Sequence, residues 1–149
     1  MKENTFKLLR KNNERGQSLV ELAISLIVIL TLLAGAVDFG IALFSFVTLR
    51  DAAQEGALYA SIDPTNTTEI EERVFSTSDK PVDLRNDTNV TVTILPTGAT
   101  ACEGNGALVQ VQVDYDYQLS MPLLPGLLGI SEIPLSASVT DAILRPPCP

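Results

Sequence analysis

An apolar segment from Leu22 to Val37 constrains the fold most. It carries no charged residue and is slightly shorter than the roughly 20 residues that cross a bilayer. One acid stands at each end, Glu21 and Asp38, and a helix would place them about 26 Å apart. Each acid would then lie near one membrane face, where a charge costs least. The segment therefore predicts a single membrane-spanning helix, with Asp38 as an acid at the membrane interface.

The charges are divided unevenly around this segment. Residues 1–16 hold five basic and two acidic side chains (5 − 2 = +3), and the rest holds five basic and sixteen acidic ones (5 − 16 = −11), which sum to the −8 of the whole chain. Basic flanks of a span stay in the cytoplasm. We therefore expect a cytoplasmic amino terminus and an extracytoplasmic C-terminal domain in the cell membrane. So acidic a body also argues against nucleic acid as a partner.

The helix is predicted to continue beyond the membrane, over residues 17–62, because no proline occurs between Gln17 and Asp63. Only its first half fits a bilayer, at about residues 22–43. The second half must then pack against protein. A stripe of small residues on one helix face would allow close approach. The stripe consists of Ala52, Ala53, Gly56, Ala57 and Ala60. The alternative is that alanine occurs here simply because it favours helix.

Residues 63–149 are predicted to form a small extracytoplasmic α+β domain, completed by the outer half of the helix. Thr68 to Glu71 resembles a capping box that opens a short helix. Three later segments alternate between apolar and polar residues, as strands with one buried face do. They are residues 90–94, 109–117 and 133–139. The simplest solution is an antiparallel sheet on helix residues 44–62. Its expected core residues are Val109, Val111, Val113, Leu135 and Val139.

The connection between the last two strands, residues 119–130, is apolar but contains two prolines and two glycines. It is too broken for a regular strand or a second membrane span. Such a segment either caps the core or forms an exposed apolar surface for a partner.

Two cysteines, Cys102 and Cys148, both lie in the part of the chain predicted to be extracytoplasmic. Their spacing suits neither a zinc site nor a redox pair. A disulfide between them is favoured, and two unpaired thiols are the alternative, which is less usual in an oxidising compartment.

Nothing in the sequence indicates an active site. The chain has no histidine, the commonest general base and metal ligand. It also has no glycine-rich phosphate loop and no nucleophile elbow. Asp114 and Asp116 lie two apart on one predicted strand face and could share a cation, but a solvated face explains them equally well. We expect a protein that is no enzyme, with no cofactor, no metal site and no small-molecule substrate.

The first third of the chain resembles a known family. The segment from Arg15 to Ala60 is similar to the TadE-like proteins, pilin relatives of tight-adherence pilus systems. The similarity lies in RGQSLVEL at 15–22, VDFG at 37–40 and RDAAQEGALYAS at 50–61. It implies a pilin-like fold, with a long amino-terminal helix on a small antiparallel sheet. It also implies a minor pilin or pseudopilin of a type IV-related pilus or secretion system.

The resemblance implies processing and assembly as well. A membrane-embedded prepilin peptidase would cut between Gly16 and Gln17 and remove the basic leader, residues 1–16. The carboxylate of Glu21, the fifth residue of the mature chain, would pair with the terminal amine of a neighbouring subunit. The partners implied are the membrane, the peptidase and other pilin-like subunits. From the residues alone, Glu21 is either such a pairing group or a tolerated interfacial acid.

Two departures from the family pattern each remove a positive charge. Relatives often have a basic residue after DFG, where this chain has Ile41, and EGAR where this chain has Leu58. A charge pairing that relatives make on the helix surface is therefore expected to be missing here.

Two other readings compete. An ordinary signal peptide cleaved after Ala36 would release a secreted domain that begins at Val37. The chain could also stay uncut, as a bitopic membrane protein with an extracytoplasmic binding domain. The mature amino terminus separates the three.

Overall fold

A computed structural model describes residues 3–96, 108–120, 125–126 and 129–144, with side chains from residue 16 onward. The chain divides into two compact units, Met1–Val37 and Asp38–Pro149. Cys102 and Cys148, the predicted disulfide partners, lie outside the described residues.

The first unit contains only helix α1, which spans Glu3–Ala60 and continues into the second unit. Twelve large apolar side chains between Leu19 and Val37 are each 48 to 70% exposed. By length and composition, the stretch Gly16–Ala60 is able to cross a membrane. This part of the helix is apolar on all sides, and its own protein does not bury those side chains. Such a helix is stable only in apolar surroundings.

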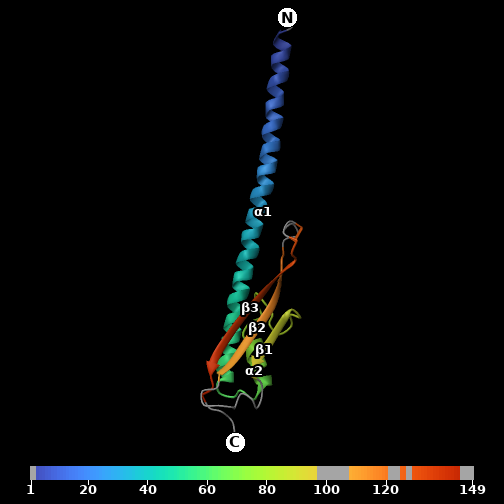
Figure 1. The fold of residues 1–149 in the computed structure, drawn as a ribbon. Coiled ribbons are helices and arrows are strands. Elements are labelled where there is room, and N and C mark those ends of the chain that lie inside the picture. Colours follow the sequence, from blue (N-terminus) through green and yellow to red (C-terminus); the bar gives the residue numbers. More distant parts are fainter. Residues whose placement is uncertain (1–2, 97–107, 121–124, 127–128, 145–149) are drawn as a thin grey trace. The chain divides into compact units, whose positions relative to one another are not determined.

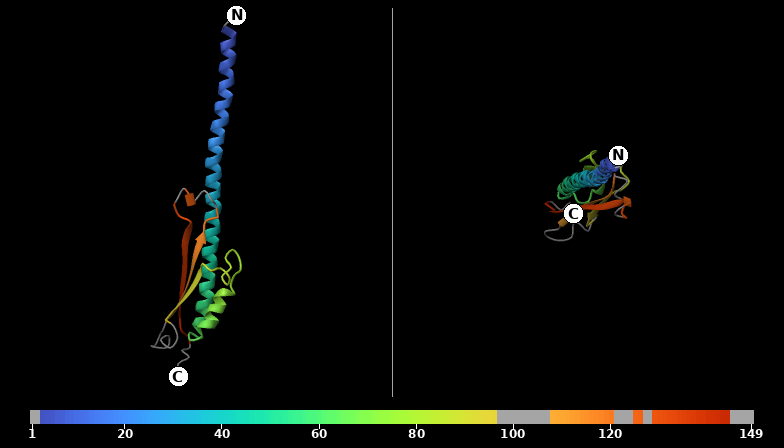
Figure 2. Two further views of the ribbon diagram at one scale, coloured as in Figure 1. Left: turned by 90° about the vertical axis from the view of Figure 1, so that its right-hand side faces the viewer. Right: turned by 90° about the horizontal axis from the view of Figure 1, so that it is seen from above.

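The second unit places a three-stranded sheet along the C-terminal part of α1 (Figure 1; Figure 2). The strands are β1 Val90–Leu95, β2 Leu108–Gln118 and β3 Glu132–Ala142, in the order β1-β2-β3 with both pairs antiparallel. The short helix α2 spans Thr67–Phe75. The expected α+β fold, with a long amino-terminal helix and a small antiparallel sheet, is confirmed.

The core of this unit forms between α1, α2 and the inner face of the sheet. From β2 the expected residues Val109, Val111 and Val113 are fully buried. Leu135 and Val139 of β3 are only partly buried, and Ala137 is the buried residue of that strand. The difference follows from the strand order, because β2 is central whereas β3 pairs on one side only.

The expected cap of α2 was wrong by two residues. Asn66, not Thr68, precedes the first turn, and its side-chain oxygen accepts a hydrogen bond from the backbone N–H of Glu69 at 3.2 Å. Asn66 and Glu69 hold the same three-residue spacing as a capping box, but with asparagine as the cap. Ile70 and Val74 are buried on the inner face of the helix, as expected.

Candidate functional site

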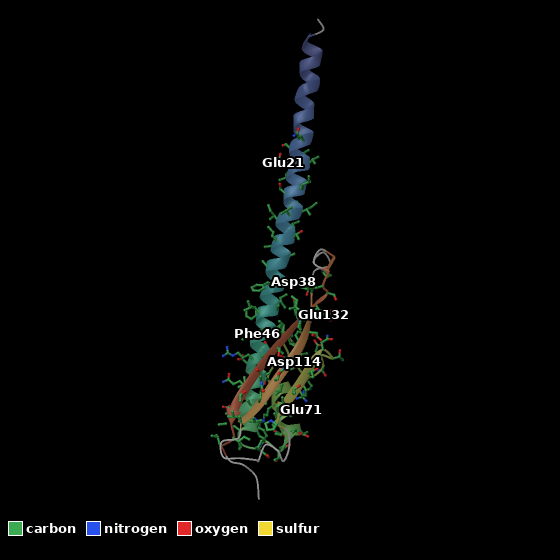
Figure 3. The ribbon with its side chains drawn as sticks, in the orientation of Figure 1. Glu21, Asp38, Phe46, Glu71, Asp114 and Glu132 are labelled. Carbon is green, nitrogen blue, oxygen red and sulfur yellow. The ribbon has the colours of Figure 1, made fainter. Side chains whose placement is uncertain are left out.

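Glu21 lies on the exposed helix of the first unit (Figure 3). Around it, Gln17, Val20, Ile24 and Ser25 line a shallow surface depression. No hydrogen bond or ion pair of this carboxylate occurs among the residues whose side chains the structure describes. A carboxylate in apolar surroundings is costly without a partner. In the first unit Glu21 is an exposed acid among side chains of its own helix.

Gly16, at the expected cleavage point, is not required by the packing of the chain. A Cβ placed on it meets nothing within 4 Å. Glycine in mid-helix also weakens the helix by about 1 kcal/mol relative to alanine. Fold stability therefore gives no reason for glycine at this position, and a substitution there would leave the fold intact.

Asp38 is the first residue of the second unit, and it is nearly fully buried, at 2% exposure. The Tyr117 hydroxyl, near the end of β2, donates a hydrogen bond of 3.4 Å to its Oδ1 atom. Burial raises the pKa of Tyr117, and the adjacent Asp38 carboxylate raises it further. Sequence reasoning placed Asp38 at a membrane face and did not find Tyr117. The alternation of the strand could have indicated Tyr117. It lies four residues after buried Val113 and therefore on the same face of the strand.

The small residues of α1 lie on the face of the helix that is buried in the domain. Ala52, Ala53, Ala57 and Ala60 are all fully buried. A Cβ added to Gly56 would stand 2.5 Å from Val74 Cγ2 of α2 and 3.2 Å from Val111 Cγ1 of β2. Contacts below 3.0 Å force a shift of backbone or side chain. Glycine at 56 thus lets α2 and β2 both approach the helix at one point.

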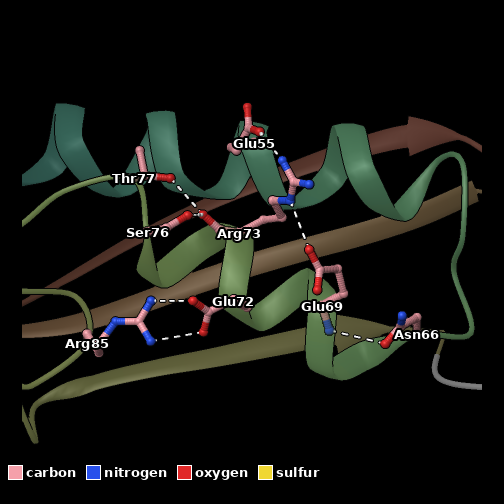
Figure 4. Close-up of polar contacts among 8 residues, drawn as sticks. All are labelled: Glu55, Asn66, Glu69, Glu72, Arg73, Ser76, Thr77 and Arg85. Atoms are coloured by element: carbon pink, nitrogen blue, oxygen red, sulfur yellow. Dashed lines mark hydrogen bonds and ion pairs between the residues drawn. The ribbon is translucent and has the colours of Figure 1, made fainter.

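Polar contacts surround this packed region on the outside (Figure 4). Arg73 of α2 pairs with Glu69 at 3.2 Å and with Glu55 of α1 at 3.9 Å, and its guanidinium lies 5.3 Å from the Tyr59 ring centroid. Arg85 makes two hydrogen bonds to Glu72, at 2.9 and 2.5 Å. These bonds lower the pKa of Glu72 and raise that of Arg85. The ion-paired side chains are 40 to 51% exposed, so each ion pair contributes little to stability.

Of the two strand aspartates, Asp116 is exposed and Asp114 has a partner on its own strand. Gln112 Nε2 donates to both carboxylate oxygens of Asp114, at 2.9 and 3.0 Å. Within the described part of the chain, no group of three or more acidic, histidine or cysteine side chains is placed to hold a metal ion.

The two residues that depart from the family pattern are both on the surface of α1. Ile41 is 36% exposed and Leu58 is 54% exposed. Leu58 lines a shallow depression with Asp51, Glu55 and other polar residues near the end of α2. A basic residue at 58 would therefore face two carboxylates, and leucine leaves them without that cation.

Comparison with known proteins gives one match. No curated protein and no solved structure is similar to the chain. The model of one family matches residues 16–58, which cover α1 from the expected cleavage point to the small-residue stripe. The match shows that this segment is similar to TadE-like proteins, and by length and composition α1 is able to cross a membrane. The family is described as TadE-like protein, so the resemblance read from the sequence is confirmed over the segment that carries Gly16, Glu21 and Asp38.

Proposed function

We propose that this protein is a structural or assembly subunit, a TadE-like minor pilin or pseudopilin, of a tight-adherence pilus or a related secretion system. The observation that carries the proposal is the division of α1 into two parts. Up to Val37 its apolar side chains are exposed, and from Asp38 onward one face is buried in the domain. The family match covers both parts.

In this proposal the first part of the helix crosses the membrane, with the basic leader in the cytoplasm and the domain outside. A prepilin peptidase cuts between Gly16 and Gln17. The open surroundings of Gly16 support this, because they leave a close approach by the peptidase as the reason for glycine. The new terminal amine of one subunit then lies within reach of the Glu21 carboxylate of the next.

Pairing of that amine with Glu21 would offset two charges that are costly in hydrocarbon, and it would favour one direction of assembly. The partners of the protein are then the peptidase, the lipid bilayer and other pilin-like subunits. The function requires no cofactor and no catalysis, because membrane insertion depends on the helix and subunit pairing depends on the Glu21 carboxylate.

The experiment that tests the proposal is amino-terminal sequencing of the mature protein from native membranes. The expected first residue is Gln17. A Gly16→Leu variant should keep the full-length chain, and a Glu21→Gln variant should be cut normally but should co-purify with the other pilin-like subunits much less. A mature protein that begins at Val37 would establish ordinary secretion, and an uncut native chain would establish a bitopic protein; either result rejects the proposal.

A further inference from the structure

Three asparagines of the second unit stand in the pattern Asn-x-Thr, the acceptor pattern for attachment of a saccharide to the asparagine amide. They are Asn66, Asn86 and Asn89, followed two positions later by Thr68, Thr88 and Thr91. All three threonines are exposed. Because so short a pattern also occurs by chance, the local contacts of each asparagine decide whether its amide nitrogen is available for reaction.

The asparagine at the start of α2 has an unsuitable geometry. The Asn66 side-chain oxygen accepts a hydrogen bond from the Glu69 amide at 3.2 Å and caps the helix (Figure 4). Thr67 and Thr68 already belong to α2. On a helix, side chains two positions apart do not face each other. Asn66 and Thr68 therefore do not present one shared surface to an enzyme unless the first turn unwinds.

The side-chain amide of Asn86 is already bound. Its Nδ2 atom donates to Asp83 Oδ2 at 2.9 Å, and its backbone amide donates to Oδ1 of the same carboxylate at 3.0 Å. The Arg85 backbone amide adds a third bond, at 3.2 Å. These bonds lower the pKa of Asp83, with that from the Asn86 side chain as the largest cause. The nitrogen that would have to react is thus held by a carboxylate.

Asn89 differs from both, because its backbone is fixed and its side chain is not. The Asn89 amide donates to Asp87 Oδ1 at 3.0 Å, and the Asn89 carbonyl accepts from the Asp116 amide at 3.3 Å. Among the described residues, no hydrogen bond involves the Asn89 side chain. The residue is half-buried, but no buried side-chain nitrogen or oxygen of the described part of the chain lacks a partner. The side-chain amide of Asn89 therefore reaches the solvent.

The strand geometry places the threonine hydroxyl on the same side. The bond from Asp116 extends the β1–β2 ladder by one residue, to Asn89 ahead of Val90. Val90 and Val92 pack against the core, so Thr91 between them faces outward. Side chains two positions apart on a strand point to the same face. Asn89 and Thr91 thus present an amide and a hydroxyl together on the outer face of the sheet.

Two further features suit an enzyme that binds this segment. β1 pairs with β2 only, so within the described part of the chain it is an edge strand. Asp87 also holds a carboxylate two positions before Asn89, a contact that a transferase can bind through arginine. The other two asparagines have Pro64 and Leu84 at that position.

We propose that Asn89 is a glycosylation site, with Thr91 as the hydroxyl that the transferase recognises. The proposal rests on the proposed extracytoplasmic placement of the second unit. The co-substrate is a saccharide activated on a polyprenyl diphosphate in the membrane. An attached saccharide is bulky and solubilising, so it would keep the outer face of the sheet in water.

The group transfer replaces one bond at the saccharide. Asn89 Nδ2 bonds to the anomeric carbon, and the bond from that carbon to the diphosphate oxygen breaks. The polyprenyl diphosphate leaves, and one proton of the amide passes to a base of the transferase.

Mass spectrometry of the full chain from native membranes tests the proposal, with peptide fragmentation to find the residue that carries a saccharide mass. Three matched variants each remove one threonine hydroxyl and keep every asparagine. Thr91→Val is the test, and Thr68→Val and Thr88→Val are the controls. All three side chains are exposed, so the fold should be unchanged. Thr91→Ser restores a hydroxyl.

The expected result is a saccharide on Asn89 of the wild-type protein. Thr91→Val and Asn89→Gln should each lower its occupancy by about tenfold or more, because the pattern requires both the amide and the hydroxyl. Thr91→Ser should retain the saccharide, since serine also satisfies the pattern. Thr68→Val and Thr88→Val should leave the occupancy of Asn89 unchanged.

An unmodified Asn89 in the wild-type protein overturns the proposal, and so does a saccharide found instead on Asn66, on Asn86 or on a hydroxyl side chain. Full occupancy in Thr91→Val would reject the role of that hydroxyl. The amino terminus of the same sample separates this site from the proposed function. An unmodified Asn89 in a protein that begins at Gln17 rejects the site alone. A saccharide on Asn89 of a protein that begins elsewhere rejects only the pilin-like function.

Discussion

At the scale of single residues, glycine has opposite roles at two positions of α1. Gly56 stands where a Cβ would meet Val74 Cγ2 at 2.5 Å, whereas a Cβ on Gly40 meets nothing within 4 Å. Alanine favours a helix over glycine by about 1 kcal/mol at either position. Only at 56 does a steric cost oppose that gain, and the crowding of a packed core costs about 1–3 kcal/mol.

The same substitution should therefore change stability in opposite directions. Gly56→Ala should lower the free energy of unfolding by about 1 kcal/mol net, and Gly40→Ala should leave it equal or raise it. Denaturant unfolding of the full chain in detergent, followed by circular dichroism, measures both. A stabilised Gly56→Ala protein would mean that α2 and β2 do not approach the helix as closely as described.

The Tyr117 hydroxyl, which contacts buried Asp38, should make stability depend on alkaline pH. The pKa of Tyr117 is raised above its ordinary 10.0, first by burial, so the folded state holds this proton more tightly than the unfolded chain. Its contribution is complete below pH 10 and is lost as pH rises through the higher folded pKa. The pKa of Tyr115 is raised too, chiefly by burial, and adds to the loss.

Tyr117→Phe removes one of these two contributions. It should cost about 1 kcal/mol at pH 7, because the 3.4 Å bond to the buried Asp38 is lost. The decline of the unfolding free energy as pH rises above 10 should become shallower, with the part due to Tyr115 remaining. An unchanged slope would show that Tyr117 is not the group that titrates. Denaturant curves at several pH values supply the comparison.

At the scale of elements, the residue that caps α2 differs between the structure and the prediction from sequence, Asn66 in the first and Thr68 in the second. Asn66→Ala should lower stability by about 1 kcal/mol, because the Glu69 amide loses its side-chain acceptor. Thr68→Ala should be near neutral, since Thr68 is an exposed residue inside the helix. Thermal unfolding of the two variants decides the matter, and a larger loss for Thr68→Ala would restore the cap expected from sequence.

The elements themselves could be predicted because each has a strong period. The alternation of β2 from Val109 to Tyr117 required one buried face, and the structure buries it. The cap of α2 was missed because asparagine, serine and threonine all serve at that position. Both Asn66 with Glu69 and Thr68 with Glu71 have the required three-residue spacing. Tyr117 as the partner of Asp38 was also missed. These residues are 79 positions apart, and only the register of the sheet on the helix brings them together.

At the scale of the whole molecule, the hydrophobic core found among the described residues lies in the second unit. Every residue of the hydrophobic cluster lies at Leu49 or beyond, and the Asp38–Tyr117 contact is also within residues 38–149. A fragment that begins at Asp38 should therefore unfold cooperatively. It should also self-associate, because Phe39, Phe44 and the neighbouring apolar residues of α1 stay exposed without lipid.

Light scattering after gel filtration, together with thermal unfolding, tests this fragment. Phe39→Ser with Phe44→Ser should reduce association while leaving the unfolding transition nearly in place, since both side chains are exposed. A fragment that begins at Phe46 should keep the core but melt lower, because it lacks Asp38 and one side of the Tyr117 contact. If the Asp38 fragment shows no cooperative transition, the domain needs its membrane helix to fold. If the Asp38 fragment is monomeric without the two serine substitutions, secretion of a domain cleaved after Ala36 becomes physically reasonable. If it associates, a protein that keeps its membrane-spanning helix is favoured.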